Sequence, residues 1–200
     1  MQYIRVPTHL GELVVRDVAE ADLDVLVDYW HGGVADLEFL GIDLDRLGTA
    51  ADTRARFRAS MRSGAAGQKA VAFVATAGPR VVAYTNVNFR GRDGYPHVHF
   101  IDAEARNQGI ASFLVPFILK MFFVHLPIDR LILEARTRNT RINRVVAKLG
   151  FQPTETRFLE RPDGLAGPGD FNVYVVEPAM VDEVLARRLG IGTTRAERPT

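Results

Sequence analysis

Hydrophobic and polar positions recur along the chain with two different periods, and each change of period marks a new element. From residue 70 the pattern has the period of two that is typical of strands, and a Gly-Pro turn joins the first two strands into a hairpin. The pattern predicts strands over residues 13–16, 70–75, 81–89, 97–101 and 131–135, and a closing hairpin of 151–159 and 171–176. Apolar residues at helical spacing predict helices over 19–30, 49–62, 110–126, 139–149 and 178–189.

The order of these elements limits how the strands can pair. Short turns connect the strands between residues 70 and 101, so we expect an antiparallel meander. The helix over 110–126 leads to the next strand, and such a helical crossover favours a parallel pair. Pro116 lies inside that helix, so we expect a bend or an irregular first turn. The sequence predicts an α/β fold in a single domain of residues 1–189, with residues 190–200 as a flexible tail.

Composition narrows the class of function. The chain has 200 residues, 47% of them hydrophobic, and a formal net charge of +1, so it has no global field that gathers nucleic acid or an anionic membrane. It has no cysteine, which excludes disulfides, thiolate metal ligands and cysteine nucleophiles. No apolar run approaches the roughly 20 residues that cross a bilayer, and residues 1–12 lack the pattern of a signal peptide. We therefore expect a soluble cytoplasmic protein without membrane contact.

The run Arg106-Asn107-Gln108-Gly109-Ile110-Ala111 joins an apolar strand to a long apolar helix. Small residues at 109 and 111 let a ligand approach the backbone closely, and the first turn of a helix offers free N–H groups that favour an anion. A diphosphate fits such a site. The alternative is an ordinary turn whose glycine only relieves backbone strain.

A second run supports the diphosphate interpretation. Residues 139–151 begin with an asparagine that opens a helix, and they end in a Gly-Phe pair. Together with residues 106–111 they resemble the two signatures of the GNAT superfamily of acyl-CoA-dependent N-acetyltransferases. The resemblance spans residues 12–177 and includes the order of strands and helices. Within it, residues 144–151 look most like the branch that includes ribosomal-protein N-terminal acetyltransferases.

The resemblance implies a GNAT-like mixed, mostly antiparallel central sheet flanked by helices. The strands on either side of the 110–126 helix would splay apart and admit the pantetheine arm of acetyl-CoA, the co-substrate. Main-chain groups near His99 would pair with that arm, and Asn139 would reach it. Arg106 would add charge beside the diphosphate, and Arg144 would meet the nucleotide phosphate. The residues implied in binding the donor are Phe100, Ile101, Arg106, Asn107, Gln108, Gly109, Ile110, Ala111, Ser112, Asn139 and Arg144.

Three side chains are candidates for the chemistry of acetyl transfer, which requires a neutral amine, a polarised thioester carbonyl and a proton for the leaving thiolate. Many family members place a tyrosine acid in the middle of the helix at 139–149, and here that position is Val146. His97 and His99 share one face of a strand and are the candidate substitutes. Glu134 on the opposite strand could orient the amine, act through water, or pair with an arginine.

Several surrounding features have two interpretations each. Tyr84, Asn86 and Asn88 form a polar row that either lines an acceptor pocket or faces solvent. The stretch 31–48 and the glycine-proline loop 161–170 could cover a substrate or be ordinary connections. The sequence does not decide between these interpretations.

We therefore expect an acetyl-CoA-dependent N-acetyltransferase whose acceptor is the primary amine of a small molecule or peptide. The valine at position 146 leaves open a noncatalytic acyl-CoA sensor. Arginine rows at 54, 58, 62 and at 136, 138, 141, 144 leave open an aminoacyl-tRNA donor, although the near-neutral charge counts against a nucleic acid. His97 and His99 have the spacing of a metal pair but lack a third ligand nearby, so no metal is expected. The architecture is compatible with a homodimer.

Overall fold

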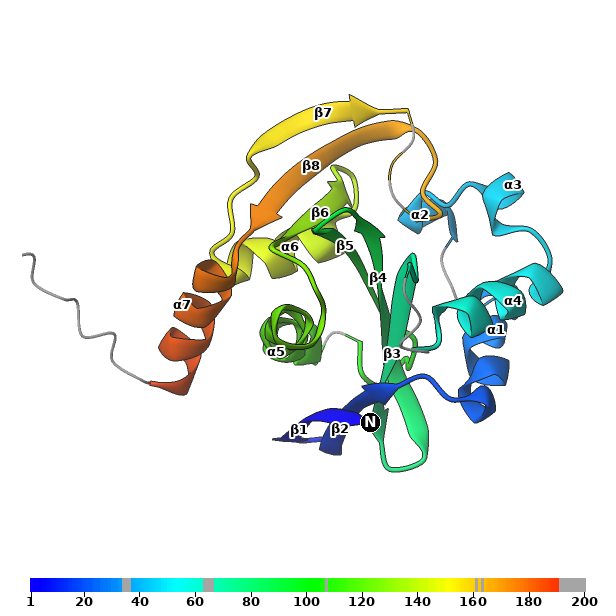
Figure 1. Cartoon of the computed structure of the whole chain (residues 1–200), viewed down its shortest axis with the longest axis horizontal. Coiled ribbons are helices and arrows are strands. Elements are labelled where there is room, and N and C mark those ends of the chain that lie inside the picture. The colour runs from blue at the N-terminus through cyan, green and yellow to red at the C-terminus, as the bar shows by residue number, and fades with distance from the viewer. Residues whose placement is uncertain (34–36, 63–66, 107, 161, 163, 191–200) are drawn as a thin grey trace, which may run out of the picture.

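The computed structural model describes residues 1–33, 37–62, 67–106, 108–160, 162 and 164–190. Through the middle of Figure 1 runs a sheet of the eight strands formed by these residues, in the order β1-β2-β3-β4-β5-β6-β8-β7. The strands are β1 Gln2–Thr8, β2 Gly11–Asp17, β3 Ala70–Ala77, β4 Arg80–Arg90, β5 Asp93–Phe100, β6 Arg130–Arg136, β7 Glu155–Leu159 and β8 Gly169–Val176. The helices are η1 Glu20–Asp22, α1 Leu23–His31, α2 Leu37–Leu40, α3 Leu44–Leu47, α4 Ala50–Ser60, α5 Ile110–His125, α6 Thr140–Leu149 and α7 Pro178–Leu189.

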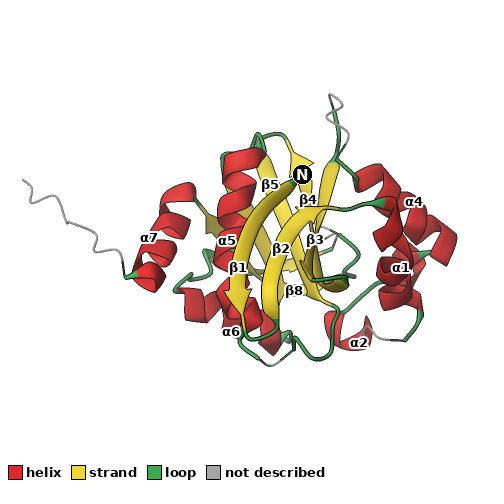
Figure 2. Cartoon of the chain, turned by 90° about the horizontal axis from the view of Figure 1, so that it is seen from below, coloured by secondary structure: helices red, strands yellow, loops and turns green. Residues whose placement is uncertain are grey.

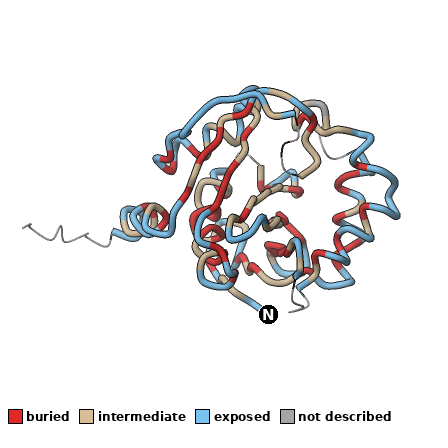
Figure 3. Tube along the Cα trace, turned by 45° about the horizontal axis from the view of Figure 1, so that its top comes forward, coloured by how far each residue is buried: buried red, intermediate tan, exposed pale blue. Residues whose placement is uncertain are grey.

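The helices cover both faces of the sheet, with α1 and α4 on one side and α5, α6 and α7 on the other (Figure 2). Strand β3 shows why both faces are apolar. Phe73 and the residues two positions before and after it pack with α5, whereas Ala72 and Val74 pack with α1 and α4. Buried positions accordingly concentrate in the central strands and on the inner sides of the helices (Figure 3). Two apolar cores result, one on each face.

Strands β5 and β6 form the one parallel pair between neighbours in the described sheet, and they pair over a short length. Their register contains two positions, Asp93 with Arg130 and Gly94 with Leu131. Beyond these positions the two strands separate, and the described residues offer β5 no ladder partner on that side as far as Phe100. The implied splayed pair is therefore confirmed.

Strands β5 and β6 thus form a V. Ion pairs, and a glycine that has no side chain, hold its closed end together. Arg130 Nε lies 2.6 Å from Asp93 Oδ1, and Arg92 Nη2 lies 2.5 Å from Asp129 Oδ1. A Cβ on Gly94 would come within 3.0 Å of the Leu131 side chain, so glycine is what lets the strands close here. The site described below lies at the open end.

The predicted fold class is confirmed, and the main strands and helices lie where the periodicity places them. Three details differ. The N-terminal strand β1 was missed, because it has only one buried residue, Val6. Residues 31–48 contain the short helices α2 and α3 rather than irregular chain alone. Helix α5 runs through Pro116 without interruption, so of the two alternatives the irregular first turn is wrong and the bend stays a prediction. Within the described ranges, no helix combines the length and apolar content needed to cross a membrane.

Candidate acetyl-transfer site

A cavity of about 880 Å³ lies where β5 and β6 separate. Its wall includes the α4 side of β4 and β5 and, through the gap between the strands, Val115 of α5 and Val146 of α6. A smaller cavity of about 170 Å³ adjoins it beside the start of α5. The residues that line both cavities are Leu40, Val98, His99, Val115, Asn139 and Ile142. The two cavities therefore meet around His99 and Asn139, in the opening of the V.

The start of α5 has the features expected of an anion cradle. Gly109 precedes the helix with φ 77°, a left-handed conformation that favours glycine, and it provides no side-chain cap. The N–H groups of Ile110, Ala111 and Ser112 lie in the first turn, where a helix has no internal partners for them. Ala111 also lines the smaller cavity. Gln108 is exposed beside this turn, and Asn107 lies outside the described residues.

Arg106 has a position that the sequence did not predict. Its Nε donates to the Phe100 carbonyl at 3.0 Å, and its Nη2 donates to the Ile101 carbonyl at 3.3 Å. These are main-chain groups that we expected to face pantetheine. Arg106 therefore ties the cradle to the end of β5, and it also lines the smaller cavity with positive charge.

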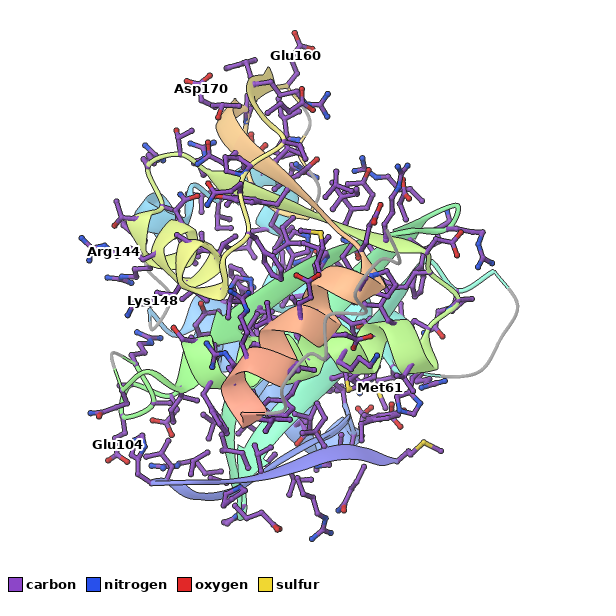
Figure 4. All side chains as sticks on the ribbon, turned by 90° about the vertical axis from the view of Figure 1, so that its left-hand side faces the viewer. Met61, Glu104, Arg144, Lys148, Glu160 and Asp170 are labelled. Carbon is purple, nitrogen blue, oxygen red and sulfur yellow. The ribbon has the colours of Figure 1, made fainter. Side chains whose placement is uncertain are left out.

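Helix α6 places Asn139 and Arg144 differently. Asn139 begins the helix, accepting from Ile142 N at 3.3 Å, and lines both cavities. Arg144 is exposed and projects outward from α6, as Figure 4 shows, and it lines neither cavity. Arg141 lines the smaller cavity instead, with its guanidinium 4.4 Å from the centre of the Phe39 ring. The assignment of Arg144 to a nucleotide phosphate stays a prediction.

His99 lies within an aromatic cluster. Its ring stacks on Tyr84 with centroids 4.8 Å apart and planes 7° apart, and the Trp30 ring lies 5.0 Å away. Its Nδ1 is 3.2 Å from the Tyr29 hydroxyl. Burial among these rings, and secondly the charge of His97, lowers the pKa of His99 from 6.5 to about 3. His99 is therefore a neutral imidazole near pH 7.

The structure brings the three catalytic candidates to the same cavity. His97 pairs with Asn86 and His99 with Tyr84 across the β4–β5 ladder, and all four line the larger cavity. The polar row of β4 therefore faces the pocket rather than solvent. Glu134 lines the cavity from β6, on the other side of the gap. Nowhere in the described part of the chain do three or more metal-ligating side chains come together, so the two histidines gain no third ligand there.

Two segments far apart in sequence cover the larger cavity. Ile42 forms an isolated antiparallel bridge with Ala166, and Asp43 N donates to the Leu165 carbonyl at 2.9 Å. Ile42 and Leu165 both line the cavity beneath. The stretch before α3 and the described part of the loop between β7 and β8 thus form a common cover over the larger cavity.

Two arginines hold this cover in place. Arg46 donates to two carbonyls of the β7–β8 loop, including that of Ala166 at 2.7 Å. Arg136 donates to the Gly167 carbonyl at 2.7 Å and to the Pro168 carbonyl at 2.6 Å. Both arginines line the larger cavity, so their charges remain next to it.

Basic side chains outnumber acidic ones in the described lining of the larger cavity. The cations are Arg46, Arg56, Lys69 and Arg136, and the one carboxylate is Glu134. Burial lowers the pKa of Arg56 and of Arg136, as expected for cations in a confined site. The local potential therefore favours a neutral amine over an ammonium group and disfavours a polycation.

The arginines at positions 54 and 58 of α4, and at position 62 just after it, contact other parts of the chain. Arg54 pairs with Asp24, and Arg58 pairs with Glu20. Arg62 donates to a tyrosine hydroxyl on β1 at 2.8 Å. These contacts favour a structural role for this row over contact with RNA.

Sequence reasoning missed Tyr29. Helical spacing predicted only a helix over residues 19–30, and nothing local distinguishes Tyr29 from another packed aromatic residue. Its contact with His99 joins residues 70 positions apart. Pairing of the strands and packing of α1 create it, so no short motif could have indicated it.

Comparison with known proteins agrees with this geometry. Residues 12–152 match the acetyltransferase (GNAT) domain family. The chain belongs to the GNAT acetyltransferase family. It is therefore an acyltransferase, with acetyl-CoA as its co-substrate. No curated protein sequence matches this GNAT acetyltransferase.

Solved structures share the fold at low sequence identity. RimJ from Mycobacterium smegmatis, in complex with CoA-disulfide, is 16% identical with a TM-score of 0.71, over 94% of this chain and 95% of that one. The ribosomal alpha-N-protein acetyltransferase RimL, in complex with coenzyme A, is 16% identical with a TM-score of 0.69, over 90% and 99%. An aminoglycoside acetyltransferase in complex with coenzyme A and kanamycin is 15% identical with a TM-score of 0.64, over 86% and 98%. The fold is thus common to proteins whose names indicate different acceptors.

Proposed function

We propose that this GNAT acetyltransferase moves the acetyl group of acetyl-CoA directly to the primary amine of a small molecule or peptide. One observation carries the proposal: the acceptor-side cavity passes through the V between β5 and β6 and adjoins the smaller cavity beside the α5 cradle. A donor bound at the cradle and an acceptor under the cover would meet near His99. Holding both reactants in this way supplies much of the rate enhancement without a covalent enzyme intermediate.

The open edge of β5 fits the donor's pantetheine arm and the thioester. Strand N–H groups alternate in direction, and Ile101 N donates to the Val82 carbonyl on β4 at 3.0 Å. The N–H groups of Val98 and Phe100 therefore face the gap. We assign them to the donor, one as a hydrogen bond to pantetheine and the other to the oxygen on which charge develops.

The lining supports a compact acceptor that attacks as a neutral amine. Its volume of about 880 Å³ lies within the range of small-molecule sites. The excess of cations favours the neutral amine, and Glu134 and His97 are the groups that we assign to orienting it. By the same argument kanamycin and spermidine, both polycations, should be poor acceptors, and amines that also carry an anionic group should be better ones.

One observation favours a second candidate, a noncatalytic acyl-CoA sensor. Val146 is 1% exposed and packs in the core formed with α5, so the usual position of the helix tyrosine has no hydroxyl. In a sensor the cradle would bind acetyl-CoA without turnover. The two functions differ in whether CoA thiol is released.

The test combines binding and turnover on one sample. Heat-induced unfolding with acetyl-CoA at about 100 times its dissociation constant should raise the midpoint by about 5 to 10 °C, since binding then stabilises by about 2.7 kcal/mol. The release of CoA thiol is then measured with a series of amines, and each amine is compared with an analogue that also carries a carboxylate or phosphate. Release supports the transferase, binding without release supports the sensor, and no shift with acetyl-CoA or CoA would refute both.

A further inference from the structure

The pair Tyr29 and His99 occupies the junction between the two cavities. His99 lines both of them, whereas Tyr29 lines the smaller one. Tyr29 is 5% exposed, comes from α1, and brings its hydroxyl to 3.2 Å from His99 Nδ1. A hydroxyl on the donor side is thus in hydrogen-bond contact with an imidazole that reaches the acceptor side.

The smaller cavity suits a leaving anion. Its described lining contains Arg106 and Arg141 and no carboxylate, and Tyr29 supplies the one hydroxyl group in that lining. The two arginines act to lower the pKa of Tyr29, although burial is the larger effect and raises it to about 12. The hydroxyl therefore stays protonated near neutral pH and can donate a hydrogen bond.

The imidazole is arranged to pass a proton on. Its Nε2 makes no hydrogen bond to the described residues, and the ring lines both cavities, so we assign Nε2 to the larger cavity. Burial keeps the ring neutral near pH 7. A neutral imidazole that carries its proton on Nδ1 can accept a proton at Nε2 while it gives one from Nδ1.

We propose that Tyr29 and His99 form a proton relay from the acceptor amine to the CoA sulfur. The inference rests on the proposed acetyl transfer. The amine nitrogen attacks the thioester carbon, a C–N bond forms and the C–S bond breaks. The amine proton moves to His99 Nε2, the Nδ1 proton moves to the Tyr29 oxygen, and the phenol proton moves to the sulfur. One proton is transferred in total and the pair ends neutral. Tyr29 thus serves as the acid for the sulfur, the role of the helix tyrosine whose position is Val146 in this chain.

The first test is a double-variant cycle on kcat. Tyr29→Phe and His99→Gln should each lower kcat by about 10²-fold, the lower end of general acid–base contributions. The double variant should lose no more than the worse single variant, because residues that act as one unit are not additive. Tyr3→Phe is the matched control. It removes a hydroxyl on β1 that donates to Asp17 of β2 at 2.7 Å, and Tyr3 lines neither cavity, so kcat should be unchanged.

The second test does not depend on turnover. Bound CoA is titrated by the ultraviolet absorbance of its thiolate, and Tyr29→Phe should raise the pKa of that thiol relative to wild type, whereas Tyr3→Phe should not. Nitrogen NMR of His99 should show the proton on Nδ1 in wild type.

The relay is refuted if wild type turns over while Tyr29→Phe, still folded and binding CoA, retains full kcat. A double variant that loses the product of the two single losses would also refute it, and so would an unchanged thiol pKa. These outcomes leave the proposed function intact. Failure of wild type to release thiol with any amine refutes the proposed function itself, while the thiol titration still reports on Tyr29.

Discussion

Replacing Gly109 by alanine tests the donor cradle with a matched control elsewhere in the chain. Gly109 has φ 77° and Gly91, in the turn between β4 and β5, has φ 64°. A Cβ added at either position would meet no atom within 4 Å, and both glycines are exposed. The two substitutions therefore differ in one respect: only Gly109 lies at the start of α5, where we place the diphosphate.

The expected magnitudes follow from this match. Each alanine is forced into the left-handed region, which costs about 1–2 kcal/mol and lowers the unfolding midpoint by about 2–8 °C in a chain of this size. The methyl group at 109 should also displace one hydrogen bond to a charged phosphate. That loss is worth about 1.5–3 kcal/mol, which weakens binding about 10- to 150-fold.

Calorimetric titration of acetyl-CoA measures the difference. Gly91→Ala should bind acetyl-CoA with the wild-type dissociation constant, and Gly109→Ala should bind it about 10- to 150-fold more weakly. The unfolding midpoint should fall by a similar amount in both variants. Equal affinities for the two variants would refute the placement of the diphosphate at α5.

Three further predictions concern the acceptor side. The free energy of unfolding should fall as pH decreases from 6.5 toward 3, because His99 becomes protonated in the unfolded chain in that window but not in the folded chain. Urea titrations of wild type and of His99→Gln measure this pH dependence, and the variant should lack the part that is due to His99. Arg46→Met should raise KM for the amine several-fold and leave acetyl-CoA affinity unchanged, since it removes bonds that hold the cover. Val146→Tyr should cost about 1–3 kcal/mol of stability by overpacking a buried position, without raising kcat.

Each of these has an outcome that contradicts it. A pH dependence of stability that is identical in His99→Gln would show that another group titrates. An acceptor KM unchanged in Arg46→Met would mean that the cover does not contribute to acceptor binding; Arg5→Met, a surface arginine paired with Glu12, controls for loss of charge. A gain in kcat for Val146→Tyr would contradict the assignment of the acid to Tyr29.

The local structure of the proposed donor side could be predicted from the sequence because its parts are local. The cradle is a strand, a short turn with a small residue and a helix, and these follow one another within residues 97–126. Gly109 and Asn139 could be identified because each stands at a helix start, where backbone geometry restricts the residue type. The role of Arg106 beside the diphosphate stays a prediction, and its two carbonyl partners could not be predicted because they depend on how the turn folds back.

The acceptor side could not be predicted in the same way because it is assembled from distant segments. The two-residue period of a strand placed His97 and His99 on one strand face. The tertiary fold decides which face of the sheet α1 and α4 cover, and the sequence pattern does not show this. The cover joins the stretch before α3 to a loop more than a hundred residues later, through the Ile42–Ala166 bridge. Neither segment has a pattern that indicates the other.

The position of the missing tyrosine shows how these two kinds of information combine. At residue 146 the sequence predicts only an absence, and a buried valine is equally compatible with a sensor and with an enzyme whose acid lies elsewhere. The structure supplies a hydroxyl on α1 that reaches the same opening from the opposite face of the sheet, in contact with His99 at 3.2 Å. Because the gap between β5 and β6 is open to both faces, a proton donor can approach the sulfur from either helical layer. In the proposed relay the gap between β5 and β6 therefore determines where the acid can stand, and the acid need not come from α6.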